Sequence, residues 1–299
     1  RDRLRSRGLG DVYKRQACVR ILRRWAEEIG YPRSFTIYDT DDSQRVMKAV
    51  YKDLNVDDKF LPIKAAINQM SRWKDQLVSP EQALASPAKD TKGALTARIY
   101  AAYEKRLKEA GAFDFDDLIY QTVQLLAEHK DVRDFYQNKY RYLLVDEYQD
   151  TSVAQFRLVS LLTGPEKNIC VVGDDDQSIY RFRLADPTIF LGKYNRFKPW
   201  QEAADGEERK ILLSRNFRSR REILESTNFI FSNILSVEMG EMDYGEDEAL
   251  HFGAAYYPER DDCQTEFHLI SAHQKSAANE RPVKRLLAEA RFTAQRIRQ

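Results

Sequence analysis

The chain has 299 residues, of which 42% are hydrophobic and 32% charged, enough apolar material for a sizeable core in two or three compact units. Its formal net charge is +1, so no overall basic field indicates nucleic acid, and no apolar run approaches the length that spans a bilayer. The three cysteines, at positions 18, 170 and 263, are odd in number and scattered, which indicates a reduced, cytoplasmic setting.

The first part of the chain is predicted to be mostly helical. A helix is expected over residues 17–32, with Val19, Leu22 and Trp25 on one side. Residues 33–111 are strongly charged and helical in pattern, and within them Ile99, Tyr103 and Leu107 share a face of a helix that Gly111 ends. Another helix is expected over residues 113–130, with three inward residues: Ile119, Val123 and Leu126.

Three short apolar runs, at residues 142–145, 169–172 and 211–213, are predicted to be buried strands. Each opens into a polar loop, which is typical of one face of a parallel sheet. Cys170 lies in the second run, and we expect it to be a small core residue. Residues 238–262 are acidic and punctuated by glycine and proline, which predicts a loop, and residues 283–297 carry a helical apolar stripe.

Paired acids, Asp146 and Glu147, end the first of these strands. Ligands of open α/β sheets lie beyond the carboxyl ends of the strands. An aspartate there can hold Mg²⁺ together with phosphate oxygens, and a neighbouring glutamate can orient or deprotonate the attacking water. Phosphate hydrolysis needs both roles, one residue for the metal and one for the water. The alternative interpretation of the two acids is an ordinary solvated loop, because strand ends are commonly polar.

Three strings together resemble motifs II, III and IV of superfamily 1 DNA helicases of the UvrD/Rep/PcrA type: DEYQD (146–150), VVGDDDQSIY (171–180) and LSRNFRS (213–219). The resemblance implies an α/β fold, namely an incomplete RecA-like parallel-sheet helicase core with an inserted α-helical subdomain. It also implies ATP and Mg²⁺ as cofactors, and single-stranded DNA and duplex junctions as partners.

The resemblance assigns nucleotide chemistry to four residues. Asp146 would coordinate Mg²⁺, and Glu147 would activate the hydrolytic water. Gln177 would sense the γ-phosphate and couple it to DNA contacts. Arg218 would be the arginine finger, a role that suits a guanidinium because phosphoryl transfer relies on positioning and charge stabilisation. The alternative for Arg218 is a surface arginine at the start of a helix.

Three further residues, Tyr180, Phe182 and Arg183, would face single-stranded DNA by the same resemblance. Two rings and a guanidinium make a plausible stacking platform. Phe182 stands where the family usually has tryptophan, so the platform would keep a smaller ring. Ordinary core packing is the alternative for Tyr180 and Phe182.

The resemblance also divides the chain. Residues 17–32 and 112–215 would form part of a RecA-like domain 1A, residues 33–111 the helical 1B insertion, and residues 216–299 the start of domain 2A. Phosphate binding in this family needs the string G-x-x-x-x-G-K-[ST], which the sequence does not contain. We therefore expect the middle of a longer helicase, with little ATPase activity of its own.

Residues 1–16 are basic, lack an apolar period and match nothing in the family. We expect them to be a non-native segment; a native basic arm that touches DNA phosphates is the alternative.

The two halves of the chain resemble different families. Residues 17–180 resemble PcrA-type helicases, whereas residues 181–299 resemble AddA, a helicase–nuclease subunit. This favours a chimeric assembly, with a natural hybrid as the alternative. Three functions remain open: a 3′→5′ helicase fragment in DNA repair or recombination, an AddA-type subunit of a nuclease complex that acts on double-strand breaks, and a non-catalytic DNA-binding fragment.

Two other polar clusters have a structural and a metal interpretation. Asp114, Asp116 and Asp117 suit the N-terminus of a helix, where acids complement the dipole, better than a second metal site. A zinc site at Cys263, His268 and His273 has no evident fourth ligand, so we expect none there.

Overall fold

A computed structural model describes most of the chain in two compact units, Arg1–Lys198 and Pro199–Gln299. The described residues are 9–86, 90–164, 168–174, 177–178, 184–236, 238, 244–246, 248–258, 264–266, 268–269 and 285–298. Helices and short parallel strands alternate in them, so the α/β class is confirmed. Within these ranges, no helix combines the length and the apolar character needed to cross a bilayer.

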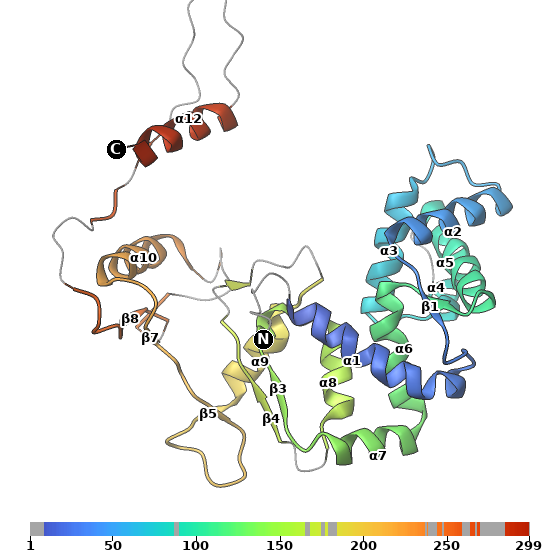
Figure 1. Cartoon of the computed structure of the whole chain (residues 1–299), viewed down its shortest axis with the longest axis horizontal. Helices are drawn as coiled ribbons and strands as arrows, with labels where there is room; N and C mark the ends of the chain where they lie inside the picture. The colour runs from blue at the N-terminus through green and yellow to red at the C-terminus, as the bar shows by residue number, and fades with distance from the viewer. Residues whose placement is uncertain are drawn as a thin grey trace, which may run out of the picture. The chain divides into compact units, whose positions relative to one another are not determined.

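The first unit contains two hydrophobic clusters, each built by four helices (Figure 1). One cluster is formed by α1 (Leu9–Trp25), α6 (Phe115–Glu128), α7 (Lys130–Lys139) and α8 (Val153–Leu162). The other is formed by α2 (Thr40–Asp53), α3 (Ile63–Asp75), α4 (Pro80–Ala85) and α5 (Thr91–Glu109). The strands β1 (Thr36–Ile37) and β2 (Ala112–Phe113) pair in parallel where the chain passes from one cluster to the other.

The predicted helices are confirmed, with changed ends. The helix expected over 17–32 begins earlier, at Leu9, and gives way at Ala26 to the 3₁₀ turn η1 (Ala26–Ile29), which ends at left-handed Gly30. In α5 the predicted face is buried, and Gly111, with φ 58°, follows the helix end. The three inward residues expected of α6 are likewise buried.

The predicted strands at 142–145 and 169–172 form a parallel pair, β3 (Leu143–Val145) and β4 (Ile169–Val171). Their predicted burial is wrong. Leu143 packs against the cluster of α1, α6, α7 and α8, but successive side chains of a strand point to opposite faces. Leu144 is accordingly 75% exposed, and its cross-strand partner Cys170 is exposed rather than in the core.

The third predicted strand, at residues 211–213, is wrong as placed. The strand β6 (Arg209–Lys210) ends before this run and β7 (Arg215–Asn216) begins after it, while Leu213 is 81% exposed. The described residues thus form four separate strand pairs and not one sheet: β5 (Lys198–Pro199) pairs with β6, and β7 with β8 (His251–Phe252), a strand within the predicted loop 238–262.

The remaining elements are helical. They are η2 (Tyr148–Asp150), α9 (Pro187–Arg196), α10 (Arg221–Ile234) and α12 (Arg285–Arg298). The last confirms the helix expected over 283–297, of which residues 283 and 284 lie outside the described ranges. The expected domain boundary at 215–216 lies within the second compact unit.

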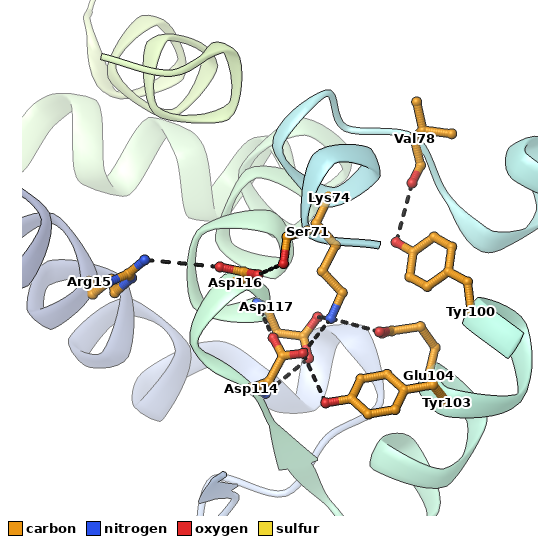
Figure 2. A network of polar contacts seen from close by, with 10 residues as sticks. All are labelled: Arg15, Ser71, Lys74, Val78, Tyr100, Tyr103, Glu104, Asp114, Asp116 and Asp117. Carbon is orange, nitrogen blue, oxygen red and sulfur yellow. Dashed lines mark hydrogen bonds and ion pairs between the residues drawn. The ribbon is translucent and has the colours of Figure 1, made fainter. Parts of the chain in front are cut away.

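A buried ammonium group joins the two clusters of the first unit (Figure 2). Lys74 of α3 is 2% exposed, and its Nζ lies 2.7 Å from Glu104 of α5, 2.8 Å from Asp114 and 2.7 Å from Asp117 of α6. The two aspartates also form the capping box of α6, in which the side chain of each accepts the backbone N–H of the other. The acids expected at a helix N-terminus are therefore confirmed there, with Lys74 as an additional partner.

One ammonium faces three carboxylates in this network, so the carboxylates titrate unequally. Burial raises the pKa of Asp117 well above its ordinary value, and the carboxylates of Asp114 and Glu104 raise it further. Burial likewise raises the pKa of Glu104, although Lys74 opposes it. Burial would also raise the pKa of Asp114, but Lys74 and three hydrogen bonds outweigh it and hold this pKa below its ordinary value. The native network therefore retains protons that free carboxylates would release.

Replacing Lys74 by methionine should lower the free energy of unfolding by about 3–5 kcal/mol, because the substitution leaves buried carboxylates without their cation. Urea unfolding followed by circular dichroism measures the loss. The matched control is Lys105→Met, since Lys105 is 76% exposed and paired with Glu109 at 3.9 Å; its cost should stay within about 0.5 kcal/mol. Equal costs for the two variants would contradict the role of Lys74.

The raised pKa of Asp117 predicts a pH dependence of stability. Above the ordinary carboxyl pKa, the native state keeps a proton that the unfolded chain has lost, so stability should fall as pH rises toward the folded pKa, by up to about 1.4 kcal/mol per pH unit. Asp117→Asn cannot bind that proton and should flatten the fall. Urea unfolding from pH 5 to pH 8 tests this, and parallel curves for the two proteins would refute it.

Candidate functional site

The acids at the end of β3 lie on an exposed, strained turn. Asp146 and Glu147 are both exposed. The Oδ1 atom of Asp146 accepts the backbone N–H of Glu147 at 2.9 Å. Glu147 has φ 51° and ψ 46°, the left-handed region, which costs a residue with a side chain about 1–3 kcal/mol. Such strain is concentrated at functional sites, and here it falls on one of the residues that the sequence predicted.

The loop after β4 reaches the same edge of the strand pair. Val172 donates its N–H to the carbonyl of Val145 at 2.8 Å, and Tyr148 donates to the carbonyl of Val172 at 2.9 Å. The parallel pairing therefore continues past both strand ends and brings the DEYQD segment beside Gly173 and Asp174. The predicted residue Gln177 is exposed in this second loop, and its Nε2 donates to Asp174 Oδ2 at 2.5 Å.

A buried residue that the sequence did not single out, Gln149, connects the two loops. It is 5% exposed, and its Oε1 accepts the backbone N–H of Asp174 at 3.1 Å. Gly173 is needed beside it, since a Cβ at this position would lie 2.8 Å from Gln149 Oε1 and 3.1 Å from the ring of Phe190. A glutamine within an acidic motif was the only signal in the sequence.

The residues at this edge fit a magnesium ion. Asp146 Oδ1 is engaged by Glu147, and within the described ranges no group donates to Oδ2. Mg²⁺ takes one or two carboxylates, keeps several waters and completes its octahedron with phosphate oxygens. The exposed carboxylate of Asp146, at the strand end, meets that demand. The neighbouring Glu147 is also exposed and takes no part in the buried network around Lys74.

The other predicted site residues divide into two groups. Arg218 lies in the second unit, on the exposed turn between β7 and α10, where Asn216 Oδ1 accepts its backbone N–H at 2.9 Å. Tyr180, Phe182 and Arg183, the predicted DNA platform, lie outside the described residues.

A second group of carboxylates has the spacing of a metal site but is filled by an ammonium. Oxygens of Glu104, Asp114 and Asp117 lie within 4.8 Å of one another, and Lys74 Nζ contacts all three (Figure 2). Neighbouring Asp116 accepts a hydrogen bond from Ser71 at 2.6 Å. Of the three residues weighed for zinc, His268 contacts Glu266 Oε2 at 2.8 Å, and positions 263 and 273 are not among the described ones.

The geometry defines the class of site: two polar loops at the carboxyl edge of a parallel strand pair, the place where α/β proteins bind their ligands. The family follows from comparison with known proteins. Residues 15–198 match the UvrD/REP helicase N-terminal domain, and the chain belongs to this helicase family.

Two relatives give the extent of the similarity. The ATP-dependent DNA helicase PcrA of Staphylococcus epidermidis is 37% identical over 262 residues, which cover 87% of this chain and 34% of that protein. The PcrA of Staphylococcus aureus is 42% identical over 216 residues, 72% of this chain and 28% of its own length. The chain thus spans about a third of the curated relatives it matches. Because the first match covers 87% of the chain, it extends beyond Tyr180.

Gln149→Leu should cost about 1–3 kcal/mol of stability, because the Asp174 N–H would lose its acceptor in a partly buried place. Chemical denaturation measures this cost. Gln177→Leu is the matched control in the same pair of loops: its amide is exposed, so the change should stay within about 0.5 kcal/mol. An equally small effect at Gln149 would show that its hydrogen bond does not hold the loops together.

Proposed function

We propose that this chain is part of an ATP-dependent DNA helicase in which ATP hydrolysis drives movement along single-stranded DNA and unwinding of duplex junctions. The single observation that carries the proposal is the joining of the DEYQD and GDDDQ loops at one edge of a parallel strand pair. The membership of the UvrD/REP family supports it. Translocation in the 3′→5′ direction and a role in DNA repair or recombination belong to the proposal through the family resemblance.

In this proposal the exposed acids divide the chemistry of hydrolysis. Asp146 would hold Mg²⁺, which when bound would supply positive charge against the negative charge that develops on the phosphates. Glu147, whose backbone is left-handed, accepts a proton from the attacking water or orients it. Gln177 contacts the γ-phosphate from the second loop, which Gln149 ties to the first.

The second unit and the DNA platform complete the proposal. Arg218 stabilises negative charge on the transferred phosphoryl group, a task for which a planar guanidinium is suited. Tyr180, Phe182 and Arg183 lie within a few residues after Gln177 in the chain. A phosphate contact at Gln177 and a base contact at these residues would therefore lie on one short segment. In the family architecture that we propose, a partial RecA-like core carries residues 33–111 as an inserted helical subdomain.

An AddA-type subunit of a helicase–nuclease complex is the second candidate, favoured by the resemblance of the sequence of residues 181–299 to AddA. Both candidates use the same ATP site. A nuclease domain in the intact gene product would favour the second, and a fragment that binds DNA without any nucleotide response would favour a non-catalytic role.

The test has a metal arm and a DNA arm. Fe²⁺ with ascorbate replaces Mg²⁺ and cleaves the backbone where it binds; peptide mapping should find cuts in residues 146–150 and 173–178, lost in Asp146→Asn. Asp116→Asn, in an acidic cluster elsewhere in the unit, should retain the cuts. In the DNA arm, Phe182→Ala should weaken binding of fluorescent oligothymidylate by roughly 5- to 150-fold, the value of one stacked base.

The outcomes separate the parts of the proposal. Cuts in only one loop would show that the two loops do not share a metal, and cuts unaffected by Asp146→Asn would remove this residue as the ligand. Unchanged oligothymidylate affinity in Phe182→Ala would remove the stacking platform. ATP hydrolysis that is stimulated by DNA and absent in Glu147→Gln would contradict our expectation that the chain has little ATPase activity of its own.

A further inference from the structure

The turn that carries Arg218 is fixed from within by its own strand. Asn216, the last residue of β7, accepts the backbone N–H groups of Arg218 and Ser219 through one side-chain oxygen, each at 2.9 Å. An asparagine that bonds the backbone two and three residues ahead sets the local turn. This interaction fixes the N–H side of the turn and leaves the carbonyl groups of Phe217 and Arg218 to other partners.

Two consecutive tyrosines hold those carbonyl groups from a distant part of the sequence. The hydroxyl of Tyr256 donates to the carbonyl of Phe217, and the hydroxyl of Tyr257 donates to the carbonyl of Arg218 at 2.5 Å. Their rings lie 4.7 Å apart. In return, Arg220 donates to the carbonyl of Pro258 at 2.9 Å and lies over the Tyr257 ring at 5.0 Å, so the two segments hold each other.

The approach of the two segments depends on a missing side chain. Gly253 follows β8 and donates its N–H to the carbonyl of Asn216 at 2.9 Å. A Cβ on Gly253 would lie 2.8 Å from the ring of Phe217. The Phe217 ring therefore lies directly over the backbone that leads to the tyrosines, which places their hydroxyls within reach of the turn.

The side chain of Arg218 is left open by all these contacts. The guanidinium is exposed, and among the described residues none pairs with it. The backbone of Arg218 is held at its N–H by Asn216 and at its carbonyl by Tyr257. The side chain is therefore attached to a fixed backbone, and its charge is available to an external anion. A group positioned in this way loses less conformational entropy when it binds its ligand.

We propose that Tyr256 and Tyr257 are positioning residues for Arg218, which aim its guanidinium at a polyphosphate through the backbone of the 217–219 turn. The inference rests on the proposed function, because Arg218 is the residue assigned there to the phosphoryl group. It adds a segment some forty residues downstream to the nucleotide machinery, in a region for which the sequence predicted only a loop.

The experiment follows Arg218 itself in the chain labelled with ¹⁵N-arginine. Its Nε–Hε resonance is identified by its loss in Arg218→Lys, and inorganic tripolyphosphate is titrated while the shift of this resonance is recorded. Tyr257→Phe removes one hydroxyl and should weaken the apparent affinity at Arg218 about fivefold, the size of one ordinary hydrogen bond. The double variant with Tyr256→Phe should weaken it further.

The matched control is Tyr244→Phe, which removes a hydroxyl of the same unit that donates to Asn228 at 2.8 Å, outside the 217–219 turn. It should leave the affinity at Arg218 unchanged. Melting temperatures of all variants are compared, since a positioning role predicts a weaker response at Arg218 without a matching loss of stability.

Three results would overturn the proposal, and they are distinguishable. An unchanged affinity in Tyr257→Phe, with Arg218 still responding to tripolyphosphate, would remove the tyrosines and leave the role of Arg218 intact. No response of Arg218 in the unaltered chain would remove the proposed role of Arg218 together with its supports. A fall in melting temperature with equal weakening at every responding arginine would show a purely structural role for the tyrosines.

Discussion

The first unit depends on one constraint: a buried ammonium on one helix must be matched by carboxylates from two other helices. Lys74, Glu104 and the pair Asp114 and Asp117 belong to α3, α5 and the start of α6. Each aspartate uses one oxygen for the helix cap and the other for Lys74, so α6 cannot begin elsewhere without leaving a buried charge unpaired. Such a network adds little net stability over an apolar core, but it permits one register. Because α6 also packs in the cluster that Leu143 contacts, the register of the helices limits where β3 can lie.

The candidate site follows a different rule, in which the functional side chains are exposed and only the backbone beneath them is held. Asp146 and Glu147 lie in solvent, whereas Gln149 is buried between the two loops. Its amide oxygen supplies the acceptor that the Asp174 N–H needs. The left-handed turn at Glu147 is tolerated because the backbone on both sides is engaged, by Asp146 Oδ1 before it and by the Val172 carbonyl after it. Backbone strain of this kind persists only where the surroundings determine it in this way.

Local patterns predicted much of this structure, and long-range pairing explains the failures. The faces of α5 and α6 follow from a 3.6-residue period that needs no partner. The prediction of a strand at 211–213 was wrong because an apolar run becomes a strand only when another strand pairs with it. The predicted burial of Cys170 was wrong because burial of a strand face depends on what covers that face. Lys74 could have been noticed: it stands four residues after Met70 and seven after Ile67, on the buried stripe of α3. A lysine there predicts a buried partner, but its identity comes only from the fold.

In each of the two units, considered by itself, hydrogen bonds to the backbone fix the segment that carries the exposed charged groups. In the first unit, side chains of Asp146 and Gln149 accept backbone N–H groups of the two acidic loops. In the second, Asn216 accepts the N–H of Arg218 while Tyr257 donates to its carbonyl. A direct ion pair would also hold a charged side chain, but it would neutralise the charge that the proposed function assigns to phosphate or metal. Hydrogen bonds to the backbone fix the position and leave the charge available. In the proposed phosphoryl-transfer site, lasting polar contacts are therefore expected on the peptide groups beside the residues proposed for catalysis. Gln149 and Tyr257 satisfy that expectation although neither carries a formal charge.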